Sequence, residues 1–444
     1  MTRALFDDAL LQQPFARVGG APRLRADLVR DAQVLATRLP AADFVLNHCE
    51  DRYAFTVGFV AALLRRQTTL FPPNRAPEVL ARLALNYPHT YLLTDGDEQV
   101  PGMARVHLKL ASTTLAAPDA RALSFSPTQP ALIAFTSGST GTPVAHAKTF
   151  GMLLDEAQAA AQAFALGTHR GHALVATVPA QHMYGLLTSV LWPLTQNLTV
   201  DGARPFYPED VRAALARQKA QAILITTPVH IRALVLEGVR LPQLAFVLSS
   251  TAPLHAELAG RAEALFGAPV WEIYGSTETG AIARRRQTDD VAWRPFAGVV
   301  PSANEHGFDV RAPYLSAPVR LSDDIETQAD GGFILRGRHT DLVKIAGKRM
   351  SLADLNRILL SLDGVLDGAF FCPDAAAGQE PRLMAFVVAP GRTRDELLGA
   401  LKDRIDPVFM PRPLRILDGL PRNANGKLPR AELKALAQQM GVQP

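Results

Sequence analysis

The stretch AFTSGSTGTPVAHAK (Ala134–Lys148) overlaps the end of the apolar run ALIAF and is rich in serine, threonine and glycine. The apolar run predicts a buried strand, and the small residues predict a loop at its end. Two interpretations of this loop compete. It is either a flexible surface turn or a cradle whose backbone N–H groups and hydroxyls bind phosphate oxygens. The stretch alone does not decide between them, so the rest of the chain must.

Helix and strand patterns alternate on both sides of this loop. Before it, AFTVGFVAALLRR and APEVLARLALNY have helical periodicity, and TTLFPP and HTYLLTD are typical of strands. After it, the alternation continues through FGMLLDEAQAAAQAFAL, HALVATVPA, PEDVRAALARQK and AQAILITTPV. This order predicts an α/β fold, with largely parallel sheets covered by helices on both faces. Proline and glycine accumulate over residues 290–324, which indicates irregular β structure.

A domain boundary is predicted at the charged turn Gly337–Asp341. The length of 444 residues is about three times that of a typical domain, so at least two domains are expected. We expect a large N-terminal α/β domain over residues 1–337, which includes the irregular β part. A small α+β C-terminal domain is expected over residues 338–444.

Composition indicates an ordinary globular protein, with 48% hydrophobic and 20% charged residues. The longest apolar segment, Tyr53–Leu64, is too short to cross a membrane and suits a core helix. The N-terminus carries acidic residues where an export signal needs an apolar stretch. Two cysteines, Cys49 and Cys372, cannot form a disulfide framework. We therefore expect a cytoplasmic protein without a membrane span.

The net charge of +4 lies entirely within residues 338–444, which contain 16 Lys+Arg and 12 Asp+Glu. One interpretation is a solvated surface. The other is a face that meets an acidic partner or a phosphorylated thiol cofactor. A nucleic-acid partner is not expected, because the chain lacks a dense basic run with interleaved aromatic residues.

Four further stretches contain candidate functional residues. WEIYGSTETG places Tyr274, Thr277 and Glu278 on one loop, where the tyrosine could stack on a base and the glutamate could hold Mg²⁺. LPRNANGKLPR presents Lys427 at an Asn-Gly turn, and VPAQHMYG places His182 just after a strand. The fourth stretch is LRGRHTDLVKIAGKR. Taken singly, each also fits an ordinary polar turn or a structural histidine.

Several other chemistries are excluded by pattern. IAGKR and NANGKL lack the hydroxyl residue that follows lysine in a P-loop. No H-E-x-x-H occurs, and NHCEDR has no partner pair at the spacing of zinc ligands. TSGSTG has no glycine two residues before either serine, so it is not the nucleophile elbow of serine hydrolases.

Taken together and in this order, the stretches resemble the adenylate-forming superfamily of acyl-CoA and aryl-CoA synthetases, peptide-synthetase adenylation domains and luciferases. TSGSTGTP resembles its phosphate loop, YGSTETG its adenine-and-magnesium loop, GRHTDLVKIAGKR its inter-domain hinge and LPRNANGK its terminal lysine motif. The four motifs span Thr136–Lys427, which is most of the chain. The resemblance favours the phosphate cradle over the surface turn.

The resemblance implies a nucleotide site whose members come from loops and turns. They are Thr136, Ser137, Gly138, Ser139, Thr140 and Gly141 for the phosphates, Thr251, Ala252, Tyr274 and Gly275 around adenine, and Asp324 and Arg338 at the ribose. Asp323 stays open as the alternative to Asp324, because the choice rests only on the apolar residue that usually follows.

The resemblance also implies residues for catalysis. Thr277 would contact the α-phosphate, Glu278 would hold Mg²⁺, and Lys427 would act in the first of two steps. His182 would gate an acid pocket whose other candidates are Tyr184, His230 and Ser250. The hinge would include Thr340 and Asp341, and the thiol step would use the segment with Gly347 and Arg349.

The implied reaction activates a carboxylic acid with ATP and Mg²⁺ as an acyl-adenylate. The acyl group then passes to CoA or to the phosphopantetheine of an acyl carrier protein, after the small domain has rotated. Polar or small pocket candidates favour a small or hydroxylated aryl acid. Short segments before Thr136 and between Glu278 and Asp324 resemble the small ligases of pigment and aryl-polyene pathways.

One departure from the family pattern keeps a second function open. Val144 stands where the family usually has a lysine after the proline of the phosphate loop, and the next lysine is Lys148. This change puts one phosphate-facing charge in doubt. The alternative is a non-catalytic member of the same fold that binds nucleotide or acyl-adenylate without turnover.

Overall fold

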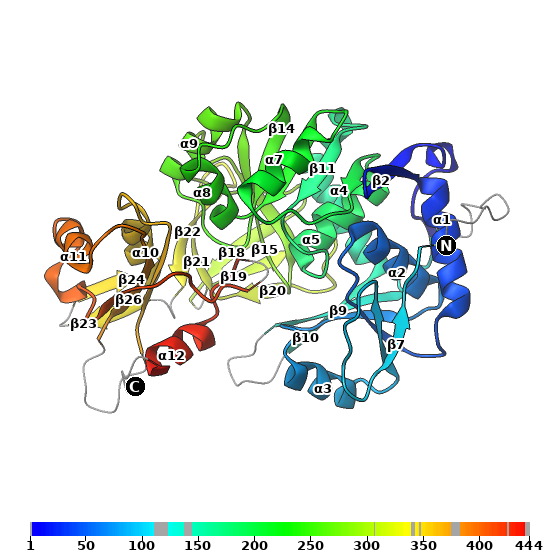
Figure 1. The fold of residues 1–444 in the computed structure, drawn as a ribbon, viewed down its shortest axis with the longest axis horizontal. Coiled ribbons are helices and arrows are strands. Elements are labelled where there is room, and N and C mark those ends of the chain that lie inside the picture. The colour runs from blue at the N-terminus through cyan, green and yellow to red at the C-terminus, as the bar shows by residue number, and fades with distance from the viewer. Residues whose placement is uncertain are drawn as a thin grey trace.

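The structure is a computed structural model that describes residues 2–110, 123–136, 144–305, 307–338, 342–345, 348–373, 382–423 and 426–439. Its large N-terminal part contains two main sheets with helices around them, and the smaller C-terminal part lies beside it (Figure 1). The α/β class predicted from the sequence is confirmed. None of the helices within the described ranges is long and apolar enough to cross a membrane. The cytoplasmic location stays a prediction.

The first sheet has six strands, all parallel except the edge strand β10. In spatial order they are β10 (Val144–Thr149), β9 (Pro130–Thr136), β5 (Thr68–Phe71), β4 (Phe44–Asn47), β6 (Thr90–Thr94) and β7 (Ala104–His107). The helices of this region are α1 (Arg25–Arg38), α2 (Arg52–Leu64) and α3 (Pro77–Asn86). The interior strands are short apolar runs, as expected for strands buried on both faces.

The second sheet has nine strands and a parallel centre with antiparallel edges. Its order is β17 (Arg294–Pro295), β16 (Gly280–Arg285), β15 (Val270–Ser276), β14 (Leu244–Ser249), β13 (Ala222–Thr226), β11 (Ala173–Ala176), β12 (Thr199–Asp201), β2 (Pro14–Val18) and β3 (Ala21–Leu24). The predicted parallel arrangement is therefore confirmed, and it is divided between two sheets. The N-terminal strands β2 and β3 join the far edge of the second sheet, which the local pattern does not predict.

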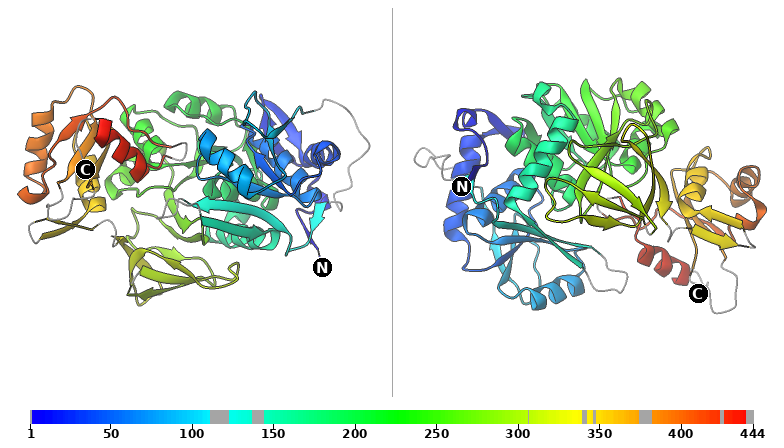
Figure 2. Two further views of the ribbon diagram at one scale, coloured as in Figure 1. Left: turned by 90° about the horizontal axis from the view of Figure 1, so that it is seen from below. Right: turned by 180° about the vertical axis from the view of Figure 1, so that it is seen from behind.

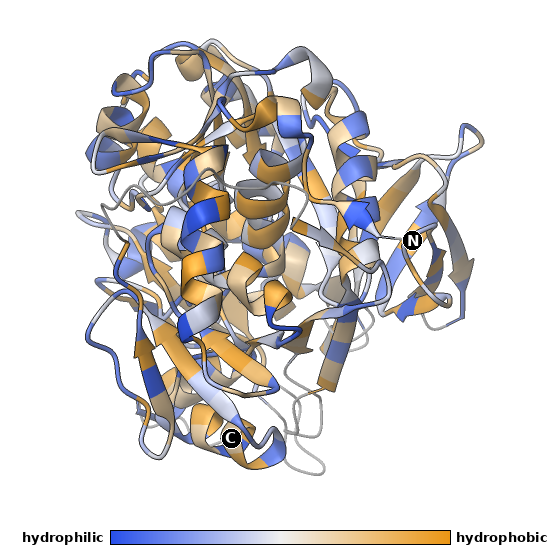
Figure 3. Cartoon of the chain, turned by 90° about the vertical axis from the view of Figure 1, so that its right-hand side faces the viewer, coloured by the Kyte–Doolittle hydropathy of each residue, from blue (hydrophilic) through white to orange (hydrophobic). Residues whose placement is uncertain are grey.

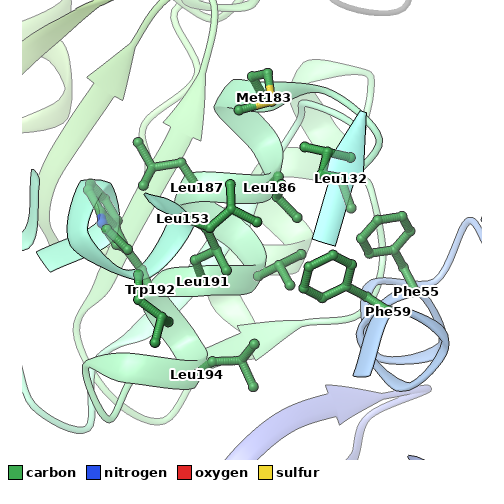
Figure 4. Packing of buried hydrophobic residues seen from close by; sticks show 14 of the residues in the cluster. Phe55, Phe59, Leu132, Leu153, Met183, Leu186, Leu187, Leu191, Trp192 and Leu194 are labelled. Carbon is green, nitrogen blue, oxygen red and sulfur yellow. The ribbon is translucent and has the colours of Figure 1, made fainter. Parts of the chain in front are cut away.

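Helices cover the second sheet on both faces. One face packs against α7 (Pro208–Ala216), α8 (Pro228–Leu236) and α9 (Ala256–Phe266). The other face shares a larger core with the first sheet, and this core contains α2, α4 (Phe150–Ala163) and the continuous segment α5 (Met183–Leu186), η4 (Leu187–Leu191) and α6 (Trp192–Thr195). Figure 4 shows Phe55 and Phe59 of α2 in the same apolar cluster as Leu132 of β9, Leu153 of α4 and Leu191 of η4. The apolar segment Tyr53–Leu64 is thus the core helix that its length predicted.

Local sequence explains where several helices begin and end. Thr149 caps α4 by accepting a hydrogen bond from the backbone N–H of Met152 at 3.3 Å. Gly267 ends α9 in the left-handed conformation that glycine adopts most readily. Figure 3 shows hydrophobic and hydrophilic residues mixed around the helices that cover the sheets, as expected for helices with one buried face.

Smaller β units complete the N-terminal part. They are β1 (Arg3–Ala4) with β8 (Ser124–Phe125), the sheet of β18 (Val300–Asn304), β19 (Gly307–Arg311) and β20 (Val319–Leu321), and the hairpin of β21 (Asp323–Thr327) and β22 (Phe333–Arg338). These strands match the irregular β structure predicted after residue 290. The β18–β20 sheet projects from the rest of the molecule in the left view of Figure 2.

The C-terminal part has its own apolar core, formed by helices and a three-stranded sheet. Its elements are β23 (Leu342–Ile345), β24 (Lys348–Ser351), α10 (Leu352–Leu360), β25 (Asp367–Phe371), β26 (Met384–Val388), α11 (Arg394–Lys402), β27 (Leu414–Ile416) and α12 (Arg430–Gln439). Arg232 of α8 donates a hydrogen bond across to the carbonyl oxygen of Leu360 at 3.0 Å. The predicted boundary at Gly337–Asp341 lies at the end of β22 and remains a prediction.

Candidate active site

The hairpin of β9 and β10 forms one side of the candidate site. The two strands flank the predicted phosphate loop, and Thr136 is paired in register with Val144. The remaining loop residues Ser137, Gly138, Ser139, Thr140 and Gly141 lie outside the described residues. Val144 is 49% exposed, so the position that usually carries a lysine stands directly across from Thr136 at the mouth of the loop.

His146 connects Thr136 to Glu278. Residues 144, 146 and 148 share one face of β10 because side chains alternate along a strand. The Nε2 atom of His146 lies 3.0 Å from Oγ1 of Thr136 and 3.7 Å from Oε1 of Glu278. Burial lowers the pKa of His146, aided by Lys148 and opposed by Glu278. Two of the predicted residues therefore meet through a histidine that the sequence did not single out.

Two buried side chains, from β10 and α4, hold the main chain around the loop that carries Thr277 and Glu278. Lys148 is buried, and its Nζ donates a hydrogen bond to the main-chain carbonyl oxygen of Glu278 at 2.6 Å. The buried Glu156 of α4 accepts a hydrogen bond from the backbone N–H of Ala281 at 2.8 Å. Burial raises the pKa of Glu156 to about 7, although the hydrogen bond from Ala281 and the nearby Lys148 oppose this shift.

Tyr274 and Gly275 lie at the end of β15, just before this loop. The ring of Tyr274 is 5.3 Å from that of Trp293 and 6.0 Å from that of Phe333, so its orientation is set by aromatic neighbours. Gly275 is needed for space, because a Cβ there would lie 2.1 Å from the carbonyl oxygen of Gly280. This close approach gives Gly275 a role in the hairpin, in addition to its predicted place beside adenine.

The turn predicted to face adenine contains a strained residue. Thr251 has φ of +78°, a conformation that β-branched side chains rarely adopt. Its hydroxyl is buried and has no hydrogen-bond partner among the residues that the structure describes. Ala252 follows it and is half-buried. Backbone strain of this kind gathers at ligand sites, where a surrounding structure enforces it.

The ribose candidates are neighbours on one hairpin. In the pairing of β21 with β22, Asp323 is opposite Arg338 and Asp324 is opposite Gly337. The strand therefore brings both aspartates to the main chain of the predicted arginine. The register does not choose between the two aspartates.

His182 and the C-terminal lysine lie together. His182 caps α5, and its Nδ1 accepts a hydrogen bond from the backbone N–H of Tyr184 at 3.3 Å. Burial and the charge of Lys427 lower the pKa of His182 to about 3, so this imidazole is neutral at physiological pH. Gly426 approaches the large domain so closely that a Cβ there would lie 3.3 Å from Oγ1 of Thr227.

The turn that presents Lys427 is supported from inside the small domain. Arg422 makes a bidentate pair with Asp367 at 2.6 and 2.7 Å and donates to the carbonyl oxygen of Gly426 at 2.8 Å. Asn423 accepts a hydrogen bond from the backbone N–H of Lys427 at 3.0 Å. Lys427 is therefore an exposed residue on a turn whose main chain is held by hydrogen bonds.

The polar side chains predicted to line the acid pocket form hydrogen bonds with other residues of the fold. The hydroxyl of Tyr184 donates to the carbonyl oxygen of Leu248 at 2.8 Å, and that of Ser250 donates to Ile273 at 2.9 Å. Nδ1 of His230 lies 2.9 Å from Oγ1 of Thr227. These hydroxyl groups bond to the main chain of the sheet, and their role in selecting a small or hydroxylated acid stays a prediction.

The predicted hinge and thiol-step residues lie in the sequence from the end of β22 to β24. Thr340, Asp341 and Gly347 lie outside the described residues, and Arg349 lies on β24. Their roles stay predictions.

The donor chemistry fits a divalent cation shared with a nucleotide. Within the described ranges, no three His, Cys, Asp or Glu side chains are grouped closely enough to hold a metal ion. Mg²⁺ is commonly bound by one or two carboxylates together with phosphate oxygens of the substrate. The half-buried carboxylate of Glu278, next to the predicted phosphate loop, suits that arrangement.

Sequence reasoning missed His146, Glu156 and Arg422. Strand alternation on β10 could have placed His146 on the same face as Val144, since they are two residues apart. Glu156 and Arg422 act through contacts 125 and 55 residues away, for which the local pattern gives no signal.

The fold is that of ATP-bound MatB from Rhodopseudomonas palustris, with a TM-score of 0.79 and 18% identity over 98% of this chain and 97% of that one. Fold and motif order together define the adenylate-forming class. Residues 34–305 match the AMP-binding enzyme family and residues 355–427 match the C-terminal domain of AMP-binding enzymes, and the chain belongs to this family.

Two relatives are named as 4-coumarate–CoA ligases. The one from Cereibacter sphaeroides is 30% identical over 299 residues, 66% of this chain and 69% of the relative. The one from Halorhodospira halophila is 33% identical over 309 residues, 66% of this chain and 73% of the relative.

Proposed function

We propose that this protein is an ATP-dependent carboxylic acid ligase that forms a thioester in two steps. In the first step, an oxygen of the carboxylate bonds to the α-phosphorus of ATP and the bond to the β-phosphate oxygen breaks. The products are an acyl-adenylate and pyrophosphate. In the second step, a thiol sulfur bonds to the acyl carbon, the thiol proton is lost, and AMP leaves.

The observation that carries this proposal is the convergence of distant motifs. Glu278 lies beside Thr136 through His146, although more than a hundred residues separate the two motifs. The turn of Lys427 meets the large domain at Thr227, near His182. Both meetings are expected if one nucleotide and one acid bind between the domains.

Each side chain has a defined part in this proposal. Glu278 would hold Mg²⁺, which when bound would offset the negative charge of the phosphate oxygens. Lys427 would neutralise charge that develops at the α-phosphate, where an oriented cation needs no reorganisation of water. Thr277 would donate to the same phosphate, and His182, as a neutral imidazole, would border the acid.

The acid and the acceptor thiol form the finer part of the proposal. We favour a small aryl or acyl acid, on the basis of relatives named for 4-coumarate, such as the two described above. CoA and the phosphopantetheine of an acyl carrier protein are both acceptors that the positive charge of residues 338–444 would attract. The relatives' names favour CoA.

Pyrophosphate exchange tests the first step. Labelled pyrophosphate should enter ATP only when a suitable carboxylic acid is present, and a panel of aryl and short-chain acids would identify it. The acceptor is then found by adding CoA or a carrier protein with its phosphopantetheine arm. If no acid in the panel produces exchange, the result would favour the non-catalytic alternative. The observation that supports this alternative is the valine at position 144.

Varying the ionic strength gives a second test, of whether charge attracts the acceptor to the C-terminal part. Attraction by long-range charge is screened over roughly 10 Å at 0.1 M ionic strength. The apparent KM for the acceptor should therefore rise severalfold between about 0.05 and 0.3 M salt, while that for the acid stays constant. Equal sensitivity of both would argue against attraction by the small domain.

A further inference from the structure

Lys148 is a buried cation directly beneath the predicted metal residue. Only 4% of its surface is exposed, and its Nζ donates to the carbonyl oxygen of Glu278 at 2.6 Å. The bond joins β10 to a loop that lies 130 residues later in the chain. Burying an ammonium is costly, so this contact calls for a reason beyond ordinary packing.

A second charged side chain fixes the same loop three residues further on. Glu156 accepts from the backbone N–H of Ala281 at 2.8 Å, and the hydroxyl of Tyr314 donates to the carbonyl oxygen of Ala281 at 2.5 Å. Gly280 has φ of +69°, and a Cβ there would lie 2.3 Å from Oε2 of Glu156. The main chain of the loop is therefore held at Glu278 and at Ala281 by side chains from other elements.

Lys148 does not replace the charge that is missing at position 144. Its ammonium is committed to a main-chain oxygen and is buried, whereas Val144 is exposed across from Thr136. Between them on the same strand face, His146 contacts the Glu278 carboxylate. Strand β10 thus reaches Glu278 twice, once at its carboxylate and once at its carbonyl group.

We propose that Lys148 is a positioning residue for Glu278. It holds the main chain of Glu278 so that the carboxylate stays beside His146 and Thr136, where Mg²⁺ and the phosphates would bind. Lys148 acts through Glu278 and does not touch the nucleotide. The inference rests on the proposed function, because it assumes that Glu278 is the metal residue.

The test is calorimetric binding of ATP at a series of Mg²⁺ concentrations, without any acid. Lys148→Met should raise the Mg²⁺ concentration for half-maximal ATP binding about tenfold, the usual scale for a residue that orients a metal ligand. Lys148→Arg keeps a cationic donor and should recover part of the loss. Binding of AMP without Mg²⁺ should change much less than binding of ATP with Mg²⁺.

A double variant separates positioning from general damage. If Lys148 acts through Glu278, Lys148→Met added to Glu278→Gln should cause no further loss. Arg286→Met is the matched control, because Arg286 follows β16 at the far end of the same hairpin and pairs with Glu263 at 2.8 Å. It should lower the melting temperature without changing the Mg²⁺ dependence.

Three results would overturn the inference. They are an unchanged Mg²⁺ dependence in Lys148→Met, losses that multiply in the double variant, and an equal shift in the Arg286 control. An unchanged Mg²⁺ dependence in Glu278→Gln alone would overturn the metal assignment itself, and the inference with it. If circular dichroism shows that Lys148→Met does not fold, Lys148→Gln takes its place under the same criteria.

Discussion

Lys148 is 4% exposed and donates to a main-chain oxygen of the large domain, whereas Lys427 is exposed on a turn of the small domain. Lys148 is held by a direct contact with the loop that it supports. The main chain of Lys427 is held by its turn, because Arg422 donates to the carbonyl oxygen of Gly426 and Asn423 accepts from the backbone N–H of Lys427. The buried cation supports a loop of the N-terminal part, and the exposed cation lies on a turn of the C-terminal part, which we propose rotates between the two steps.

The difference follows from what each charge must do. A buried ammonium cannot leave its partners without exposing unpaired polar groups, so it suits a support that stays in place. In the proposed mechanism, an exposed lysine of the C-terminal part would arrive for the first step and depart before the second. The proposed reaction needs both kinds of cation.

The largest effect is expected for Lys427→Ala. Removing one oriented charge donor should slow adenylation by about two to three orders of magnitude. Pyrophosphate exchange measures this loss. The same variant, given synthetic acyl-adenylate and thiol, should form thioester at close to the unmodified rate. A comparable loss in both half-reactions would show that Lys427 holds the site together and does not act in one state of it.

Glu278→Gln should slow adenylation by about one to two orders of magnitude at limiting Mg²⁺, because the amide is a poorer ligand for a hard cation. Thermal unfolding should be nearly unchanged, since the side chain is part of a half-buried loop. Exchange assays across Mg²⁺ concentrations measure the effect. Normal turnover without excess Mg²⁺ would contradict the metal assignment.

Arg422→Met should have a smaller effect, about tenfold on adenylation, because Lys427 remains but its turn loses two fixed contacts. Arg415→Met on the exposed side of β27 is the control in the same domain. If support of the turn is what matters, only the Arg422 variant should lose exchange activity. Equal losses would mean that charge on this domain matters more than geometry.

Glu156→Gln should change how stability depends on pH. The folded-state pKa of Glu156 is about 7, above its ordinary value of 4.5, so its contribution to stability is present below pH 4.5 and is lost as the pH rises toward 7. Burial raises the pKa of Tyr314, so this neighbour stays neutral over the range. Glutamine keeps an oxygen acceptor for Ala281 and does not ionise. Between pH 5.5 and 7 the variant should gain about 1–2 kcal/mol relative to the unmodified protein.

Urea unfolding of both proteins at several pH values measures this difference. Parallel curves over the range would show that Glu156 is ionised in the folded state throughout. That result would contradict the raised pKa of Glu156.

Sequence predicted the alternation of helices and strands, and this prediction is confirmed because periodicity is a local property of the chain. The assignment of Glu278 and the phosphate loop to one site stays a prediction, although Glu278 does lie beside Thr136 through His146. The place of the N-terminal strands was not predictable, since β2 pairs with β12 across about 180 residues and β3 pairs only with β2. Long-range pairing of this kind leaves no trace in local periodicity.

Sequence alone could not predict the partners of the polar residues assigned to the acid pocket. The hydroxyls of Ser250 and Tyr184 donate to main-chain carbonyls of neighbouring strands, and their place in the pocket stays a prediction. The sequence alone does not determine the direction in which a serine or tyrosine hydroxyl points. Conversely, Glu156 looked like an ordinary helical residue, although it is buried beneath the loop of Glu278.

The left-handed conformation of Thr251 has a consequence for anyone who engineers this protein. A β-branched residue at φ of +78° costs roughly 1–3 kcal/mol of folding stability. Glycine at this position would recover much of that free energy, yet it would remove a buried hydroxyl from the turn predicted to face adenine. Screens for heat resistance and screens for catalysis should therefore select opposite residues at this one position.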